Sequence, residues 1–376
     1  MFKKKLIINI VCVIIFSLFS NIYAVDINNV AEELDLNSLI DTLKNYIQHD
    51  IDIDEMTQKL MAGEGIDYGV VGNFVINKIF NEIGVGLKAG ISILIIVILM
   101  SIIKGLELEK DNTISRVSSL VGFLLIVTIA LKSYYIIVES FVDTINLLTG
   151  IIEVIAPFML GILITTGEIA TSGIVGPVLL FVTSLIGVLV TYVIVPLLSV
   201  ALVFKIISNM SDAIKLDKFA AFFSSSSMWI ISIVLALFLG VMELESTVAT
   251  SIDEITVKTT QAAVSNLVPV VGKFVSDSIE VVMGASELIG KTVGIIGIVV
   301  LVITALIPII KLLILSVIYF IVSAISETLN TDKKIIQLCD CLSKQYKTML
   351  GIMLGVIVTF VIGIGIVINL MGKVVS

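Results

Sequence analysis

The residue types that most often perform chemistry are scarce in this sequence. The only histidine among the 376 residues is His49, and neither the H-E-x-x-H motif nor the phosphate-binding motif G-x-x-x-x-G-K-S/T occurs. Cys339 and Cys341 form a C-x-C pair, which is closer than the usual zinc-binding pair and has no histidine nearby. The four serines at 224–227 have no basic partner to activate them. The sequence therefore predicts a protein that is not an enzyme, with no catalytic residue, no metal site and no cofactor.

Charged residues inside apolar stretches are the remaining candidates for function. Glu153 lies in an apolar stretch just before Pro157, and Lys311 interrupts another stretch beside Pro308. Carboxylates within a membrane often mark ion or substrate paths, so Glu153 is the best candidate for a buried role. Lys311 is either a second intramembrane polar site or the mark of a tight turn between two spans, with its amine extended to the interface.

The segment 269–291 carries a charged stripe on an otherwise apolar or small helix. At 100° per residue its charged side chains share one face, and the i, i+4 spacing allows them to pair. The 23 residues would extend roughly 34 Å, which is long enough to cross the hydrocarbon core. The segment is therefore either a spanning or re-entrant helix that lines a lumen or subunit interface, or an interfacial helix that lies flat. The stripe consists of Lys273, Asp277, Glu280, Glu287 and Lys291.

The composition shows which kind of element must position these residues. Hydrophobic residues make up 58% of the chain and charged residues 14%, whereas an average soluble domain is about one quarter charged. The apolar residues form long blocks, and a helix needs roughly 20 of them to cross a membrane. The formal net charge of -8 disfavours nucleic acid as a partner. The predicted fold class is all-α, a polytopic integral membrane helical bundle.

The first 86 residues divide into a leader and an acidic segment. Residues 1–24 have the lysines, the short apolar core and the terminal Ala24 of a signal peptide, which is either cleaved after Ala24 or kept as an anchor. Residues 25–86 are then extracytoplasmic. Within them, 31–62 has the i, i+3, i+4 apolar spacing of an amphipathic helix. That helix either binds a partner or the membrane surface, or it is a solvated lead-in.

Residues 87–376 are predicted to be the polytopic transmembrane region. It contains about eight spans, with roughly seven to nine as the range that hydropathy allows. Lysine-bearing loops follow the first and fourth spans and precede the last, and each is expected in the cytoplasm by the positive-inside rule. The predicted spans are 87–103, 117–131 (extending towards 138), 145–165, 174–204, 228–241, 293–310, 312–325 and 350–370.

This set of spans conflicts with the lysine loops at two points. Counting crossings places Lys205 outside, although the lysines there predict the cytoplasm. Either 174–204 is broken at Pro196 into a re-entrant element, or the lysine bias is overruled. Between 243–268 and 327–347 an odd number of crossings is needed, and 293–325 supplies two, so 269–291 is the candidate for the third.

The segment 269–277, P-V-V-G-K-F-V-S-D, with the continuation to Gly284-Ala285-Ser286, resembles a stretch of the stage III sporulation protein AE family. The plan of leader, acidic segment and polytopic region with a lysine-bearing loop before the last span is also similar. The resemblance implies a multi-pass protein of the mother-cell membrane around the forespore. It also implies partners, namely other stage III A proteins and a forespore membrane protein, and no catalytic residues.

Three functions are compatible with these observations. The resemblance favours a membrane component of a channel or secretion-like apparatus between mother cell and forespore, acting as a conduit or as an assembly base, with homo-oligomers as one arrangement. Glu153 and the broken spans favour a stand-alone secondary transporter instead. A non-conducting membrane scaffold is the third alternative.

Overall fold

The computed structural model describes a helical protein. It covers residues 36–47, 55, 59, 87–88, 90–102, 112–165, 168–210, 215–267, 272–329 and 331–371, without the side chains of 244–288 and a few others. The predicted signal peptide and most of the segment 25–86 lie outside these residues. Every element in the described part is helical, which agrees with the predicted class. The elements are α3 (Leu36–Ile47), α6 (Asn112–Thr165), α7 (Ile169–Leu189), the π-helix η1 (Val190–Ile194), α8 (Val195–Met210), α9 (Asp217–Leu267), α10 (Gly272–Thr328) and α11 (Lys333–Leu370), together with a short apolar helix Gly90–Ile102.

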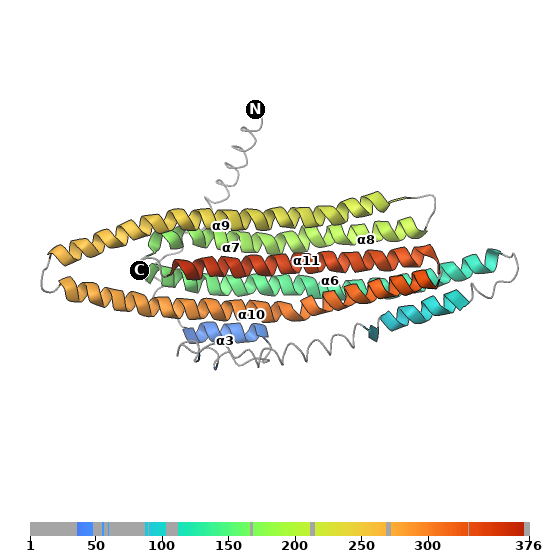
Figure 1. The fold of residues 1–376 in the computed structure, drawn as a ribbon, viewed down its shortest axis with the longest axis horizontal. Helices are drawn as coiled ribbons and strands as arrows, with labels where there is room; N and C mark the ends of the chain where they lie inside the picture. The colour runs from blue at the N-terminus through green and yellow to red at the C-terminus, as the bar shows by residue number, and fades with distance from the viewer. Residues whose placement is uncertain are drawn as a thin grey trace, which may run out of the picture.

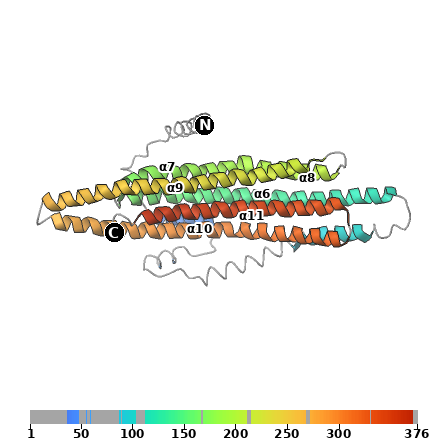
Figure 2. The same ribbon diagram turned by 45° about the horizontal axis from the view of Figure 1, so that its top comes forward.

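The long helices lie side by side along one axis. Figure 1 and Figure 2 show α6, α7–α8, α9, α10 and α11 running up and down the bundle, with α9 and α10 extending beyond the others at one end. Five helices in the described part are long and apolar enough to cross a membrane. They are Leu120–Thr165, Ile169–Met210, Asp217–Glu243, Ile289–Thr328 and Lys333–Leu370.

The expectation of about eight separate spans is not met, because two pairs of predicted spans are single helices. The 54-residue α6 joins 117–131 to 145–165, and the 57-residue α10 joins 293–310 to 312–325. The residues between the paired spans include no glycine or proline, so nothing in the backbone ends the helix there. Lys311 therefore lies inside a helix and does not mark a turn.

The structure also differs from the sequence-based expectation at Pro196. The chain runs helically from Ile169 to Met210, so Pro196 does not break it into a re-entrant element. Proline lacks the N–H that would bond to the carbonyl four residues earlier. The chain accommodates this with the π-helical turn η1, in which the Val195 N–H donates to the Val190 carbonyl one residue further back.

With these helices both topological conflicts disappear. α6, α9 and α11 run in one direction and α7–α8 and α10 in the other. The lysines around the connection of α8 to α9 (Lys205, Lys215 and Lys218) and those at the start of α11 therefore lie at the same end as the start of α6, which we call the lysine end (Figure 1). Hydrogen bonds join the chain segments there: the Asn209 side chain donates to the Lys334 carbonyl at 3.4 Å, and Ser101 donates to the Leu329 carbonyl at 3.0 Å. Asp217 pairs with Lys205 and accepts from the Ser208 hydroxyl at 2.8 Å.

This arrangement predicts the outcome of a topology map. Reporters fused after Lys215 and after Leu329 are expected to report the same compartment, the cytoplasm by the positive-inside rule. Reporters after Thr165 and after Leu267 are expected to report the opposite one. Alkaline phosphatase activity measures the outside positions, and its reciprocal pattern with a cytoplasmic reporter is the control. Opposite compartments for Lys215 and Leu329 would contradict the five-helix arrangement.

The helices are longer than a bilayer is thick. The 46-residue apolar part of α6 extends about 69 Å, whereas the hydrocarbon core is about 30 Å thick. Only part of each helix can lie in hydrocarbon. On α11 the first 15 residues, 333–347, carry five charges, and residues 348–370 carry none. The uncharged part extends about 34 Å and is the part that matches the membrane.

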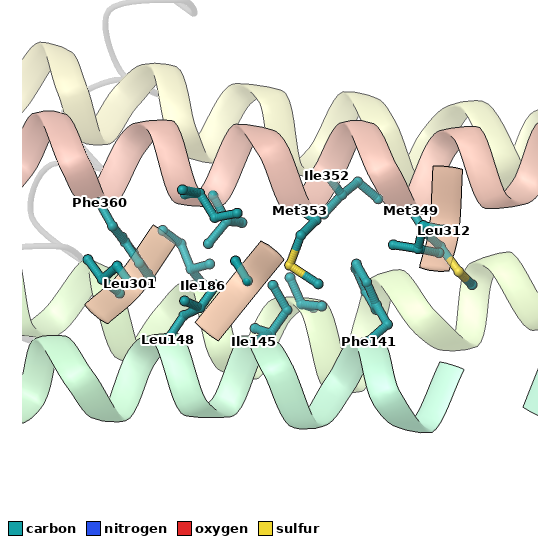
Figure 3. Close-up of a cluster of buried hydrophobic side chains, with 14 of the residues drawn as sticks. Phe141, Ile145, Leu148, Ile186, Leu301, Leu312, Met349, Ile352, Met353 and Phe360 are labelled. Carbon is teal, nitrogen blue, oxygen red and sulfur yellow. The ribbon is translucent and has the colours of Figure 1, made fainter. Parts of the chain in front are cut away.

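The interior of the bundle is filled with apolar side chains. Figure 3 shows them meeting from α6, α7, α10 and α11, and none of the labelled ones exposes more than 1% of its surface. Glycines on α10 allow the helices to approach closely, as is common between membrane helices. The labelled residues are Phe141, Ile145, Leu148, Ile186, Leu301, Leu312, Met349, Ile352, Met353 and Phe360.

The amphipathic helix α3 is packed on this bundle. Leu39, Ile40 and Leu43 are buried, as their spacing predicts, and the helix lies against α10 and α6 (Figure 1). The Tyr46 hydroxyl sits over Gly150 of α6, where a Cβ would lie 3.0 Å from it. The prediction of a solvated lead-in is therefore wrong for residues 36–47, because this helix packs against the bundle.

Candidate functional site on helix α6

Within the predicted charged-stripe segment 269–291, the described residues 272–291 form the first part of α10. The helix begins at Gly272 and continues without a break to Thr328, so the stripe is helical but is not a separate crossing. Its backbone follows the axis of α10 instead of lying flat across the bundle end (Figure 1). The side chains of Lys273, Asp277, Glu280 and Glu287 are outside the described side chains, and Lys291 is half-buried. The role of this stripe in a lumen or interface stays a prediction.

The two intramembrane candidates have different surroundings from those expected. Glu153 is exposed on the surface of α6 in this chain, whereas its apolar surroundings in the sequence predict a buried side chain. Its Oε1 accepts a hydrogen bond of 3.0 Å from the Ser184 hydroxyl on α7. Lys311 is half-buried on α10. The two residues lie on different helices, Glu153 on α6 and Lys311 on α10.

Glu153 belongs to a longer polar feature of α6 that was not predicted from the sequence. Successive residues three or four apart along α6 share one helical face, and all but the half-buried Gly150 are exposed. From first to last they extend about 44 Å along the helix. We call this set the α6 stripe: Thr128, Lys132, Tyr135, Glu139, Asp143, Asn146, Gly150, Glu153 and Pro157.

The stripe borders two other elements. Ser184 of α7 contacts it at Glu153, and Tyr46 of α3 contacts it at Gly150. Thr128 satisfies its own hydroxyl by donating to the Leu124 carbonyl at 2.8 Å. The stripe is thus a defined strip of α6 with α7 near one part of it and α3 near another.

The charges of the stripe are unsuited to a lipid environment. Three carboxylates against one lysine give 1 − 3 = −2. Charged residues in membrane helices face a bundle interior or water and rarely face lipid, because their desolvation is costly. The opposite face of α6 is apolar and buried, with Phe141 and Ile145 in the core. The stripe therefore suits a surface that meets water or another protein.

Comparison with known proteins adds the identity of the family. The family model described as stage III sporulation protein AE matches residues 51–371. A curated relative of that name from Bacillus subtilis (strain 168) is 26% identical over 220 residues, which cover 58% of this chain and 55% of the relative. The alignment thus spans about half the length of that relative, and no solved structure matches the chain significantly. Because the family model covers most of the chain, this helical membrane protein belongs to the stage III sporulation protein AE family.

Proposed function

We propose that this chain is the membrane component of a multi-protein channel or secretion-like apparatus that links mother cell and forespore during endospore formation. Family membership supports the sporulation role, and the five long apolar helices support a multi-pass membrane location. The proposed site is the mother-cell membrane around the forespore. The proposed partners are the other stage III A proteins and a forespore membrane protein. No catalytic step is proposed.

The α6 stripe is the observation that carries this proposal. A conduit needs a polar wall, but the bundle interior is filled by apolar side chains such as Phe141, Met353 and Phe360 (Figure 3). The polar residues of α6 are on the outside of the bundle instead. A path for solutes would therefore run along α6, between this chain and its neighbours in the assembly.

The exposed position of the α6 stripe also affects the two alternative functions, a stand-alone transporter and a scaffold. A stand-alone transporter needs its polar site inside one bundle, and the exposed position of Glu153 removes the residue that favoured it. A scaffold without a conduit would also use the α6 stripe, but a partner would cover it and exclude water. Water access to the stripe distinguishes a conduit from a scaffold.

Cysteine labelling tests the conduit. We expect Asn146→Cys to react with a membrane-impermeant thiol reagent in assembled complexes, in a background where Cys12, Cys339 and Cys341 are alanine. Leu354→Cys is the matched control, because Leu354 is also exposed but apolar, and Figure 3 places the neighbouring Ile145 and Met353 at the same level of the bundle. Equal protection of both cysteines would reject a water-lined path. Equal labelling of the two cysteines would show that the reagent reaches the whole outer surface of the bundle. This result would contradict a water-lined stripe on a bundle whose remaining surface faces lipid.

A further inference from the structure

The outer face of α11 changes from charged to apolar between two neighbouring turns. Lys344 and Lys347 are exposed on it, and the exposed positions Gly351, Leu354 and Val358 continue it along the helix. At 100° per residue these five positions lie within about 80° of one another, so they form one strip, which we call the α11 face. Residues 348–370 of α11 carry no charge, so the border between its charged and apolar parts is sharp.

The only tryptophan of the chain lies at the level of this border. Trp229 of α9 is 69% exposed. The methyl carbon of the adjacent Met228 lies 3.1 Å from the position that a Cβ on Gly351 would have, which brings this part of α9 beside the α11 face. Tryptophan is enriched where membrane helices pass from hydrocarbon into the headgroup layer. Trp229 and the charge border on α11 therefore mark the same membrane–water interface, on the side of the lysine end.

The two lysines of the α11 face lie at the depth of the lipid headgroups. Along the helix, Lys347 is about 6 Å from Gly351 and Lys344 is about 11 Å from it. The Lys344 amine pairs with Asp340 at 2.7 Å, and the Lys344 side chain is still 72% exposed. The Lys347 amine lies 5.1 Å from the centre of the Phe320 ring on α10. Two ammonium groups beside one carboxylate leave a net positive charge at this interface.

We propose that the α11 face binds an anionic phospholipid from the leaflet at the lysine end. The ammonium groups of Lys344 and Lys347 hold the headgroup phosphate, and the acyl chains lie along the exposed side chains of Leu354 and Val358. A phosphatidylcholine headgroup carries its own cation, whereas an anionic headgroup leaves its phosphate charge for the protein to neutralise. A lysine near an anionic membrane surface favours binding roughly fivefold. The α11 face therefore suits lipid, in contrast to the α6 stripe, whose charges continue along the helix.

Quenching of Trp229 fluorescence tests this inference, because the chain has no second tryptophan. The full-length protein is reconstituted in vesicles of phosphatidylcholine and phosphatidylglycerol, in which only one of the two lipids carries brominated acyl chains. We expect brominated phosphatidylglycerol to bind beside Trp229 roughly fivefold more strongly than brominated phosphatidylcholine, and high salt to reduce this preference. Equal quenching by the two lipids would overturn the proposal.

Substitutions assign the lipid preference to the α11 face. Lys344→Gln combined with Lys347→Gln is expected to abolish it, whereas the two arginine substitutions keep both charges and are expected to retain it. Quenching by brominated phosphatidylcholine should equal that of the unmodified protein, which shows that each variant is folded and inserted. Lys333→Gln is the matched control, because Lys333 is exposed on the same helix about 21 Å from Lys347.

A preference that survives in the double glutamine variant, or that disappears in Lys333→Gln, would contradict the proposal. This outcome is separate from the channel function, because it concerns the isolated chain in lipid.

Discussion

Replacing Gly294 with leucine is expected to prevent assembly of the bundle. A Cβ at this position of α10 would lie 2.5 and 2.6 Å from side-chain carbons of Ile368 on α11 and 3.0 Å from the Met159 methyl on α6. Added methylenes in a packed contact cost about 1–3 kcal/mol, and leucine at a three-helix contact belongs at or above the top of that range. We expect little folded protein in membranes, measured by immunoblot and by thermal unfolding in detergent.

The chain offers a matched control for this variant. Gly365 is a glycine of α11 with no atom within 4 Å of its Cβ position, so Gly365→Leu is expected to fold normally. Gly294→Ala is expected to lie between the two, because a single methyl displaces less of the Ile368 side chain than leucine does. If Gly294→Leu accumulated and melted like Gly365→Leu, α10 would not pack on α6 and α11 as described.

Replacing Asp143 with leucine is expected to abolish function without loss of the protein. Removing a charge from a membrane helix does not hinder its insertion, so abundance should hold or rise. If the α6 stripe meets water or a partner, leucine there closes the polar path or spoils the contact. We expect heat-resistant spores to fall sharply while immunoblots show normal amounts.

Two further variants make this result specific. Asp143→Asn retains a polar side chain and is expected to keep more spore formation than leucine does. Leu354→Ala changes an exposed apolar residue of α11 and is expected to have little effect. Normal spore yield from Asp143→Leu would show that the stripe has no role in the complex.

Much of the architecture could be predicted because it depends on local pattern. The apolar spacing of Leu39, Ile40 and Leu43 predicts the buried face of α3, and these residues are buried. The lysine-bearing segments were expected on one side of the membrane, and the two that the structure describes, around the connection of α8 to α9 and at the start of α11, lie at one end of the bundle (Figure 1). The family resemblance is confirmed by the family model.

The full length of α6 could not be predicted from hydropathy, because a mean hydropathy combines the polar and the apolar faces of the helix. Lys132, Glu139 and Asp143 lower the mean hydropathy between the two apolar stretches, which is why two separate spans were predicted there. These charges occupy one face, and Tyr134 and Phe141 on the other face remain buried. Helical periodicity over 128–157 would have revealed the stripe.

The exposure of Glu153 on α6 could not be predicted for a different reason. Sequence places Glu153 within an apolar stretch, but the direction of its side chain depends on which helices cover which face of α6. That information comes from packing between helices distant in sequence, such as α6 with α10. The π-turn at η1 was equally hidden, since a proline in a helix can produce a break, a kink or an extra residue.

The parts of α9 and α10 that extend beyond the apolar bundle hold their far end at a fixed distance from it. α9 continues from Glu243 to Leu267, which places the far end about 36 Å further along the axis. A helix fixes this distance at 1.5 Å per residue, whereas a flexible tether would leave it variable. Each inserted residue would lengthen the projecting helix by 1.5 Å and rotate its far end by about 100°. The number of residues in α9 and α10 therefore sets the distance between the membrane and any protein that binds the far end of these helices.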